Sequence, residues 1–165
     1  MIFVTTGTTS FPFHRLVNEV VKNFSPKIHE DVIIQSGAYL MNSPVSHITI
    51  QPYFSYQEMV RLIKKARVVI SAAGEASVFL ILQHSENIPI VVPRLDKYHE
   101  HVDDQQLLIA RFVRKMGWAK VAYNTHDLLR YLGAGGESRK LTAFSKKRNS
   151  LDAMISQLRD FTDAL

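Results

Sequence analysis

Short apolar runs that alternate with amphipathic helical patterns constrain the fold of this chain more than any other feature. The runs are rich in Val and Ile, as at Ile2–Thr5 and Val68–Ile70. Between them the apolar residues take a helical spacing, so that Leu16, Val20 and Phe24 share one face. Apolar strands joined by helices are typical of a parallel sheet buried on both sides. The sequence therefore predicts an α/β fold, a Rossmann-like parallel sheet with helices on both faces.

The pattern also predicts where the elements lie. The expected strands are Ile2–Thr5, Val32–Ile34, Ile48–Ile50, Val68–Ile70, Pro89–Val92 and a short one near Lys120–Ala122. The expected helices are Leu16–Phe24, a helix that begins after Ser55 in a capping box with Glu58, Ala76–His84, Val102–Met116, His126–Leu132 and about Glu137–Leu165. A length of 165 residues without repeats is that of one ordinary domain, so we expect a single domain over residues 1–165.

Composition removes several classes of protein. The chain has no cysteine, which excludes disulfides, thiolate metal sites and a cysteine nucleophile. Its longest apolar run, Val68–Leu82, is interrupted by polar residues and is shorter than the roughly 20 residues that span a bilayer. No basic stretch precedes the first apolar run, so no signal peptide is expected. We therefore expect a soluble, cytoplasmic chain whose net charge of +5 favours anionic partners: nucleotide phosphates, a phospholipid surface or RNA.

Three segments follow expected strands and lead into helices: Thr5–Ser10, Ser71–Ser77 and Pro93–Gln106. In a parallel sheet of this kind, ligands bind at the carboxyl ends of the strands. We therefore expect the three segments, called here the first, second and third loops, to converge on one edge.

The first two loops have the small residues of a phosphate-binding turn. Gly7, Thr8 and Thr9 offer backbone N–H groups and hydroxyls at the start of a helix. Gly74 permits close approach of a ligand, and the Ser77 hydroxyl can bond a phosphate oxygen. Spacing alone slightly favours ordinary helix capping for the first turn, and it favours capping and phosphate binding about equally for the second. Because neither G-x-G-x-x-G nor a P-loop is present, an NAD site or an ATPase is not expected.

The third loop is unusual in its side chains. It collects two histidines, four acids, two glutamines and a tyrosine directly after a buried strand. A ligand-binding role is favoured over that of a plain solvated loop. His99 and His101 with Asp103 and Asp104 could hold a divalent metal. An organic ligand ranks above a metal, since two of these groups would face different ways on a helix's first turn.

A basic cluster, Lys146-Lys147-Arg148, lies in the expected C-terminal helix. A solvated helix face is the simplest interpretation. Contact with anionic lipid or a partner subunit is the alternative. Nucleic acid is not an expected partner, because no recognition motif accompanies the charges.

Taken together, the loops resemble the C-terminal, donor-binding domain of family 28 glycosyltransferases. The segment Val4–Thr9 is similar to the family's Thr-Val-Gly-Thr-Thr start, and Gln35-Ser36-Gly37 to its turn after the second strand. The most specific match is Ile90–Arg94 followed by Glu100–Gln106. The small stand-alone members of the family, subunits of two-part UDP-sugar transferases of dolichol-linked or bacterial exopolysaccharide synthesis, are the most similar.

The resemblance implies one half of a GT-B-type glycosyltransferase that binds a UDP-sugar and transfers the sugar without a metal or cofactor. It implies a separate, membrane-anchored acceptor subunit, which would bring the chain to the inner face of the membrane. His101 would be catalytic. The implied donor contacts are Gly7, Thr8, Thr9, Tyr56, Gly74, Ser77, Glu100, Asp104, Gln105 and Gln106.

Two positions depart from the family pattern. The family's Ser-His-Ala-Gly turn reads Ser71-Ala72-Ala73-Gly74 here, without the histidine. Leu80 stands where many members have a glutamate for the ribose hydroxyls. Two alternatives to the transferase therefore stay open: a non-catalytic regulatory subunit with a degenerate donor site, and a nucleotide-binding protein outside sugar transfer.

Overall fold

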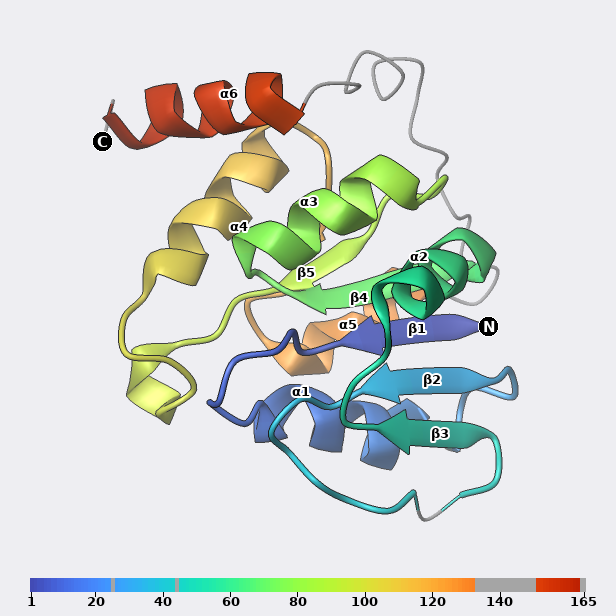
Figure 1. Ribbon diagram of the computed structural model, residues 1–165. Helices are drawn as coiled ribbons and strands as arrows, with labels where there is room; N and C mark the ends of the chain where they lie inside the picture. The colour runs from blue at the N-terminus through green and yellow to red at the C-terminus, as the bar shows by residue number, and fades with distance from the viewer. Residues whose placement is uncertain (25, 44, 133–150, 164–165) are drawn as a thin grey trace.

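The fold is a six-stranded parallel sheet. A computed structural model describes residues 1–24, 26–43, 45–132 and 151–163. The strands lie in the order β3-β2-β1-β4-β5-β6, so the chain starts in the middle of the sheet and builds outward first to one side and then to the other (Figure 1). Their bounds are β1 Ile2–Thr5, β2 Val32–Gln35, β3 Ile48–Gln51, β4 Val68–Ala72, β5 Ile90–Val92 and β6 Lys120–Val121. The predicted Rossmann-like sheet is confirmed.

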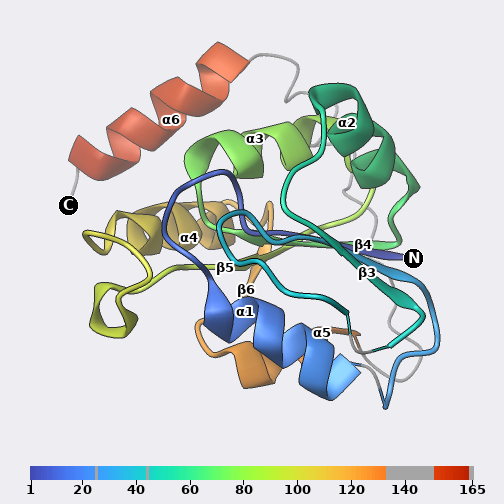
Figure 2. The ribbon, with the colours of Figure 1, turned by 60° about the horizontal axis from the view of Figure 1, so that its bottom comes forward.

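Helices cover both faces of the sheet, as predicted. Figure 2 shows α1 and α5 below the sheet and α2, α3 and α6 above it. The helices are α1 His14–Glu19, α2 Tyr56–Lys65, α3 Glu75–His84, α4 Gln105–Lys115, α5 Leu128–Leu132 and α6 Leu151–Asp163. Shorter turns are the π-helical η1 Val20–Phe24 and the 3-10 turns η2 Asp96–Tyr98 and η3 Thr125–Asp127.

The strands alternate side chains between two apolar cores. In β1, Ile2 and Val4 pack with α1 and α5, whereas Phe3 packs with α2 and α3. In β5 the side chains alternate in the same way: Val92 packs on the α1 face, and Val91 packs in the core between α3, α4 and α6. Both faces are therefore dry along β1, β4 and β5, which explains why these strands read as continuous apolar runs.

Several element boundaries differ from the sequence prediction, three of them in the kind or start of a helix. The helix expected from Val102 begins only at Gln105, because Asp103 accepts a hydrogen bond from the Gln105 N–H and Asp104 accepts one from the Asp96 N–H. Side chains that bond nearby backbone in this way compete with the helix. The first helix loosens into the π-helical η1, and the helix expected from His126 starts as a 3-10 turn.

The carboxyl ends of the strands all point to one edge of the molecule, on the left in Figure 1. This edge carries the three loops. None of the helices in the described residues is both long and apolar enough to span a bilayer. The start expected for the C-terminal helix, near residue 137, and the basic cluster at 146–148 lie outside the described residues.

Candidate functional site

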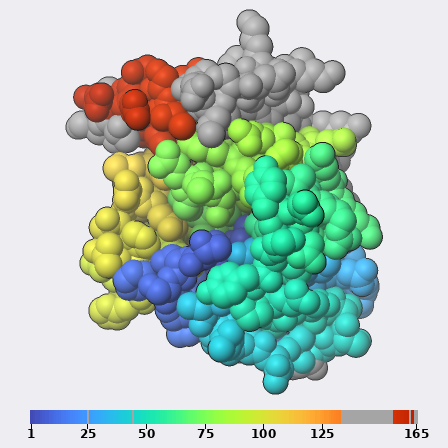
Figure 3. Space-filling view, in the orientation of Figure 1, coloured from blue at the N-terminus to red at the C-terminus, as the bar shows by residue number. Residues whose placement is uncertain are grey.

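The first loop is held in place by the last residue of β2 and by a glycine just after it. Gly7 has a φ of 78°, a conformation that favours glycine, and its carbonyl accepts a hydrogen bond from Gln35 Nε2 at 3.2 Å. Gly37 approaches the same turn so closely that a Cβ there would lie 2.9 Å from the Gly7 carbonyl oxygen. Any larger residue at position 37 would thus displace the loop. In Figure 3 the blue N-terminal segment lies at the surface, flanked by yellow and teal segments.

Arg94 joins the first and third loops. Its side chain is 1% exposed, and its Nη2 donates to the Thr6 carbonyl at 2.8 Å. Its Nη1 donates to the carbonyls of Phe11 at 2.8 Å and Glu100 at 3.2 Å. The guanidinium also lies 4.5 Å from the centroid of the Phe13 ring. One buried side chain therefore sets the spacing between two loops that are more than 80 residues apart in the sequence.

Burial lowers the pKa of Arg94 to about 10, although the Glu100 carboxylate acts in the opposite direction and Arg15 again lowers it. The guanidinium consequently keeps its charge at neutral pH. Its three carbonyl contacts and the aromatic ring compensate part of the desolvation.

Glu100 is buried and fully engaged within the protein. Arg15 binds both of its carboxylate oxygens, with Nε and Nη2 at 2.9 and 2.8 Å, and the Leu95 N–H donates to Oε2 at 3.1 Å. Arg15 Nη2 also donates to the Pro93 carbonyl at 2.9 Å. This bidentate pair ties α1 to the third loop.

The remaining residues expected in the third loop lie at its surface or at the start of α4. Gln106 is buried, and its Oε1 accepts from the Arg94 N–H at 3.1 Å, whereas Gln105 is exposed. His101 Nδ1 lies 3.0 Å from Asp103 Oδ1, and its ring centroid is 5.7 Å from that of Phe11. Asp104 bonds the Asp96 N–H. The carboxylate of Asp103 thus fixes the His101 ring with Nε2 as its other nitrogen.

The second loop faces the first. A Cβ on Gly7 would lie 3.6 Å from Ser77 Oγ, so these two positions are neighbours in space. Gly74 is the N-cap of α3, and a Cβ there would meet no atom within 4 Å. No side chain caps this helix, so its first N–H groups are directed toward the edge where the loops meet. The expected convergence of all three loops is confirmed.

A cavity of about 460 Å³ opens beside the second loop. It brings together Tyr56 at the start of α2 and Leu80 in α3, two residues singled out from the sequence. Tyr56 is exposed and Leu80 is half-buried. The other lining residues are Glu75, Ala76, Phe79, Gln83 and Ile155.

Two residues of this region were not found from the sequence. Arg15 carries no motif, and Gln83 lies in a segment that reads as an ordinary helix. The sequence partly indicated the role of Arg94, because a charged residue directly after a buried strand needs a hydrogen-bonding or charged partner. Within the described residues, no group of three His, Asp or Glu side chains is arranged to hold a metal ion.

Comparison with known proteins extends these observations. The model of the glycosyltransferase family 28 C-terminal domain matches residues 1–163. Among solved structures, a glycotransferase of kitacinnamycin is similar over 97% of this chain, with a TM-score of 0.60 and 14% sequence identity. The chain spans only 39% of that protein, and at this identity the likeness concerns the fold alone. Comparison with curated protein sequences gives no significant match.

Proposed function

Because the chain belongs to the glycosyltransferase family 28 C-terminal domain family, we propose that it binds a UDP-sugar at the carboxyl edge of the sheet and delivers the sugar to an acceptor held by a separate, membrane-anchored subunit. The family domain is one half of a GT-B glycosyltransferase and binds a sugar-nucleotide donor. The choice of UDP, the lipid-linked or polysaccharide acceptor and the partner subunit are our proposal.

The convergence of the three loops beside the Tyr56–Leu80 cavity is the observation that carries the proposal. The uracil and ribose would occupy the cavity. The diphosphate would lie against Gly7–Thr9 and against the start of α3 at Gly74 and Ser77, where the N–H groups of the first helical turn and the helix dipole favour anions. The sugar would then extend toward Gln105 and Gln106.

The third loop would supply the groups for the reaction. The acceptor oxygen bonds the anomeric carbon, the bond from that carbon to the UDP oxygen breaks, and UDP leaves with the electron pair. His101, oriented by Asp103, would contact the leaving diphosphate through Nε2, and the α3 N–H groups would stabilise its charge. The acceptor's proton would pass to a base of the partner subunit. Asp104 and Glu100 would act by shaping the loop, since protein groups already occupy their carboxylates.

Leu80 cannot bond a ribose hydroxyl, but the same cavity offers other polar side chains. Gln83 lies about one helical turn beyond Leu80, and Glu75 lies in the first turn of α3. A carboxylate in that first turn would repel the donor's diphosphate. Gln83 is therefore the better partner for the ribose in the proposed complex.

Replacing Leu80 with glutamate tests where the nucleoside binds. If the cavity receives the ribose, Leu80→Glu strengthens UDP binding about tenfold, the effect of one hydrogen bond to a charged group. Titration calorimetry measures this. Leu40→Glu, at an exposed leucine outside the cavity, is the matched control and leaves the affinity unchanged. Absence of UDP and UDP-sugar binding, with or without a co-purified partner, would refute the proposal.

The non-catalytic alternative is favoured by Leu80 and by Ala72, which is buried in the α1-side core and offers no polar group. It predicts that a complex with an acceptor subunit transfers sugar equally well when Gln106 becomes Ala. The catalytic proposal predicts a loss of transfer for both Gln106→Ala and His101→Ala in that complex.

A further inference from the structure

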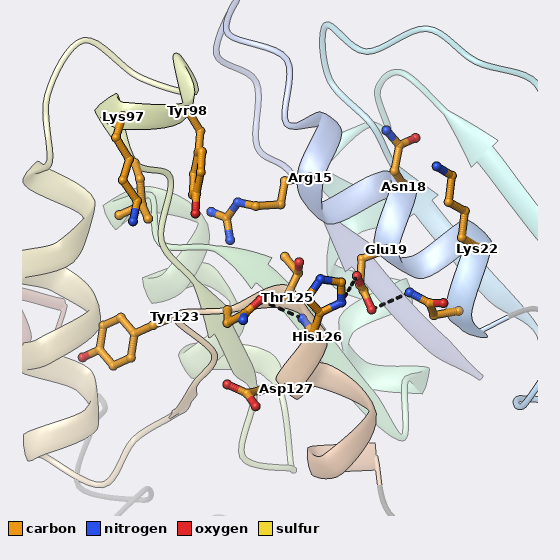
Figure 4. Close-up of a pocket in the computed structure, with 13 residues that line it drawn as sticks. Arg15, Asn18, Glu19, Lys22, Lys97, Tyr98, Tyr123, Thr125, His126 and Asp127 are labelled. Atoms are coloured by element: carbon orange, nitrogen blue, oxygen red, sulfur yellow. Dashed lines mark hydrogen bonds and ion pairs between the residues drawn. The ribbon is translucent and has the colours of Figure 1, made fainter.

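A second cavity lies on the other face of the sheet, between α1, η2 and the segment that follows β6 (Figure 4). Its volume of about 660 Å³ is that of a small-molecule site. None of the residues proposed to contact the UDP-sugar lines it. The residues around it are Arg15, Asn18, Glu19, Lys22, Asn23, Leu95, Lys97, Tyr98, Tyr123, Asn124, Thr125, His126 and Asp127.

Two lysines give the cavity a positive charge that the protein does not neutralise. Neither Lys22 nor Lys97 has a carboxylate within ion-pairing distance among the described residues. The carboxylates nearby are engaged elsewhere: Glu19 lies 3.0 Å from His126 Nδ1, and Asp127 lies 3.5 Å from Arg130. An anionic group at either side of the cavity would therefore gain an ammonium partner without breaking an existing pair.

Aromatic rings form another part of the wall. Tyr98 is 51% exposed, so the face of its ring is accessible to a ligand in the cavity. The Lys97 ammonium lies 4.9 Å and the Arg15 guanidinium 5.0 Å from its ring centroid. In Figure 4, Tyr98 and Lys97 lie side by side on η2, and both extend toward the segment that carries Thr125. Tyr123 adds a second, partly exposed ring.

Neutral hydrogen-bonding groups complete the lining. Three asparagines, at positions 18, 23 and 124, line the cavity together with the buried Glu19, and Asn23 Nδ2 donates to Glu19 Oε1 at 2.7 Å. His126 binds the other Glu19 oxygen through Nδ1 and leaves Nε2 as the second ring nitrogen. The lining thus contains many neutral donors and acceptors but only two unpaired lysines. It therefore suits a hydroxyl-rich ligand of low charge better than a polyanion.

We propose that this cavity binds a saccharide that carries a carboxylate or a phosphate group. The anion meets the ammonium of Lys97, the sugar's C–H face packs against the neighbouring Tyr98, and the hydroxyls bond the asparagines and His126, with Lys22 on the opposite side of the cavity (Figure 4). The choice of a sugar, rather than another hydroxyl-rich anion, rests on the proposed function. Arg15 borders this cavity and also binds Glu100, so an occupant here contacts the residue that holds the third loop.

Ligand-observed magnetic resonance titration of the whole chain tests the site. The probes are glucuronate, which carries a carboxylate, and glucose 6-phosphate, which carries a phosphate. Glucose, which lacks the anionic group, and inorganic phosphate, which lacks the sugar, are the comparison ligands. We expect at least one acidic sugar to bind about tenfold more tightly than either half. The double variant Lys22→Gln/Lys97→Gln lowers that affinity about tenfold, and Tyr98→Ala lowers it as well. The matched control is Lys64→Gln/Lys65→Gln, at exposed lysines of α2, which leaves it unchanged.

Three results would overturn the site: glucose binding as tightly as the acidic sugars, phosphate alone binding as tightly, or equal losses in the two double variants. The experiments also distinguish failure of this site from failure of the proposed UDP-sugar site. Lys22→Gln/Lys97→Gln retains UDP affinity if both proposals hold. Acidic-sugar binding without any UDP binding would refute only the donor site, and UDP binding without acidic-sugar binding would refute only this one.

Discussion

At the scale of single residues, Arg94 is the side chain on which the geometry of the carboxyl edge depends most. Its guanidinium donates to three backbone carbonyls, two in the first loop region and one in the third. Its own N–H is fixed by Gln106. These are hydrogen bonds from a buried cation, so they are both strong and directional.

Arg94→Met should lower the free energy of unfolding by about 3 kcal/mol, because three buried carbonyls lose their donor. It should also weaken UDP binding as the loops separate. Arg94→Lys recovers only part of both losses, since an ammonium cannot match the planar fork. Urea unfolding and calorimetry measure the two effects. Arg111→Met, at an exposed site of α4, is the control. A cost for Arg94→Met no larger than that of Arg111→Met would contradict the role.

Contacts between residues distant in the sequence could not be predicted from residue spacing. Glu100 is expected from the resemblance to contact the donor, yet its carboxylate binds Arg15, 85 residues earlier. Only the fold brings these two together. The composition of the third loop, rich in polar groups, predicted a ligand-binding role, and that role stays a prediction. It did not reveal which of those groups bind the protein itself.

At the scale of elements, local chemistry decided how well the sequence predicted each boundary. The six strands are apolar runs bounded by turn residues, and all were predicted. The capping box of α2 is confirmed: Ser55 Oγ accepts from the Glu58 N–H and Glu58 accepts from the Ser55 N–H. The start of α4 was wrong by three residues, because Asp103 and Asp104 bond the loop backbone rather than cap a longer helix.

The capping box makes a prediction that depends on pH. Hydrogen bonds from the Ser55 hydroxyl and then from the Ser55 N–H hold the pKa of Glu58 below its ordinary value. The carboxylate's contribution to stability is therefore complete above the ordinary pKa and is lost as the pH falls through the lowered one. Ser55→Ala should raise the pKa of Glu58 toward its ordinary value in a magnetic resonance titration.

The same substitution should destabilise the protein by about 1 kcal/mol at neutral pH, the usual effect of losing a serine N-cap. The difference in unfolding free energy between Ser55→Ala and the unmodified chain should narrow in acid. An unchanged pKa of Glu58 in the variant would contradict the capping assignment.

At the scale of the whole molecule, the C-terminal helix completes the cavity in which the nucleoside is proposed to bind. Leu158 of α6 is buried in the core with α3 and α4, and the rings of Phe161 and Phe112 lie 5.5 Å apart. Ile155 lines the Tyr56–Leu80 cavity. In Figure 1, α6 lies above α3 and α4. Residues from the two ends of the chain therefore surround the proposed donor.

This arrangement predicts that Leu158→Ala lowers the free energy of unfolding by about 2 kcal/mol and also weakens UDP binding, because α6 no longer packs firmly. Leu132→Ala is the control: it removes a buried leucine from α5 on the opposite face, with similar destabilisation. Its UDP affinity should stay unchanged under conditions where both variants are folded. Equal losses of UDP affinity in the two variants would show that the effect is general.

Amide chemical shifts of isotope-labelled protein during a UDP titration test the donor site most directly. If UDP binds as proposed, the N–H signals of Gly7, Thr8, Gly74 and Ser77 shift together and saturate with one dissociation constant. The signal of His126, on the other face of the sheet, stays in place. No shift at millimolar UDP, or shifts centred on His126, would contradict a donor site at the carboxyl edge.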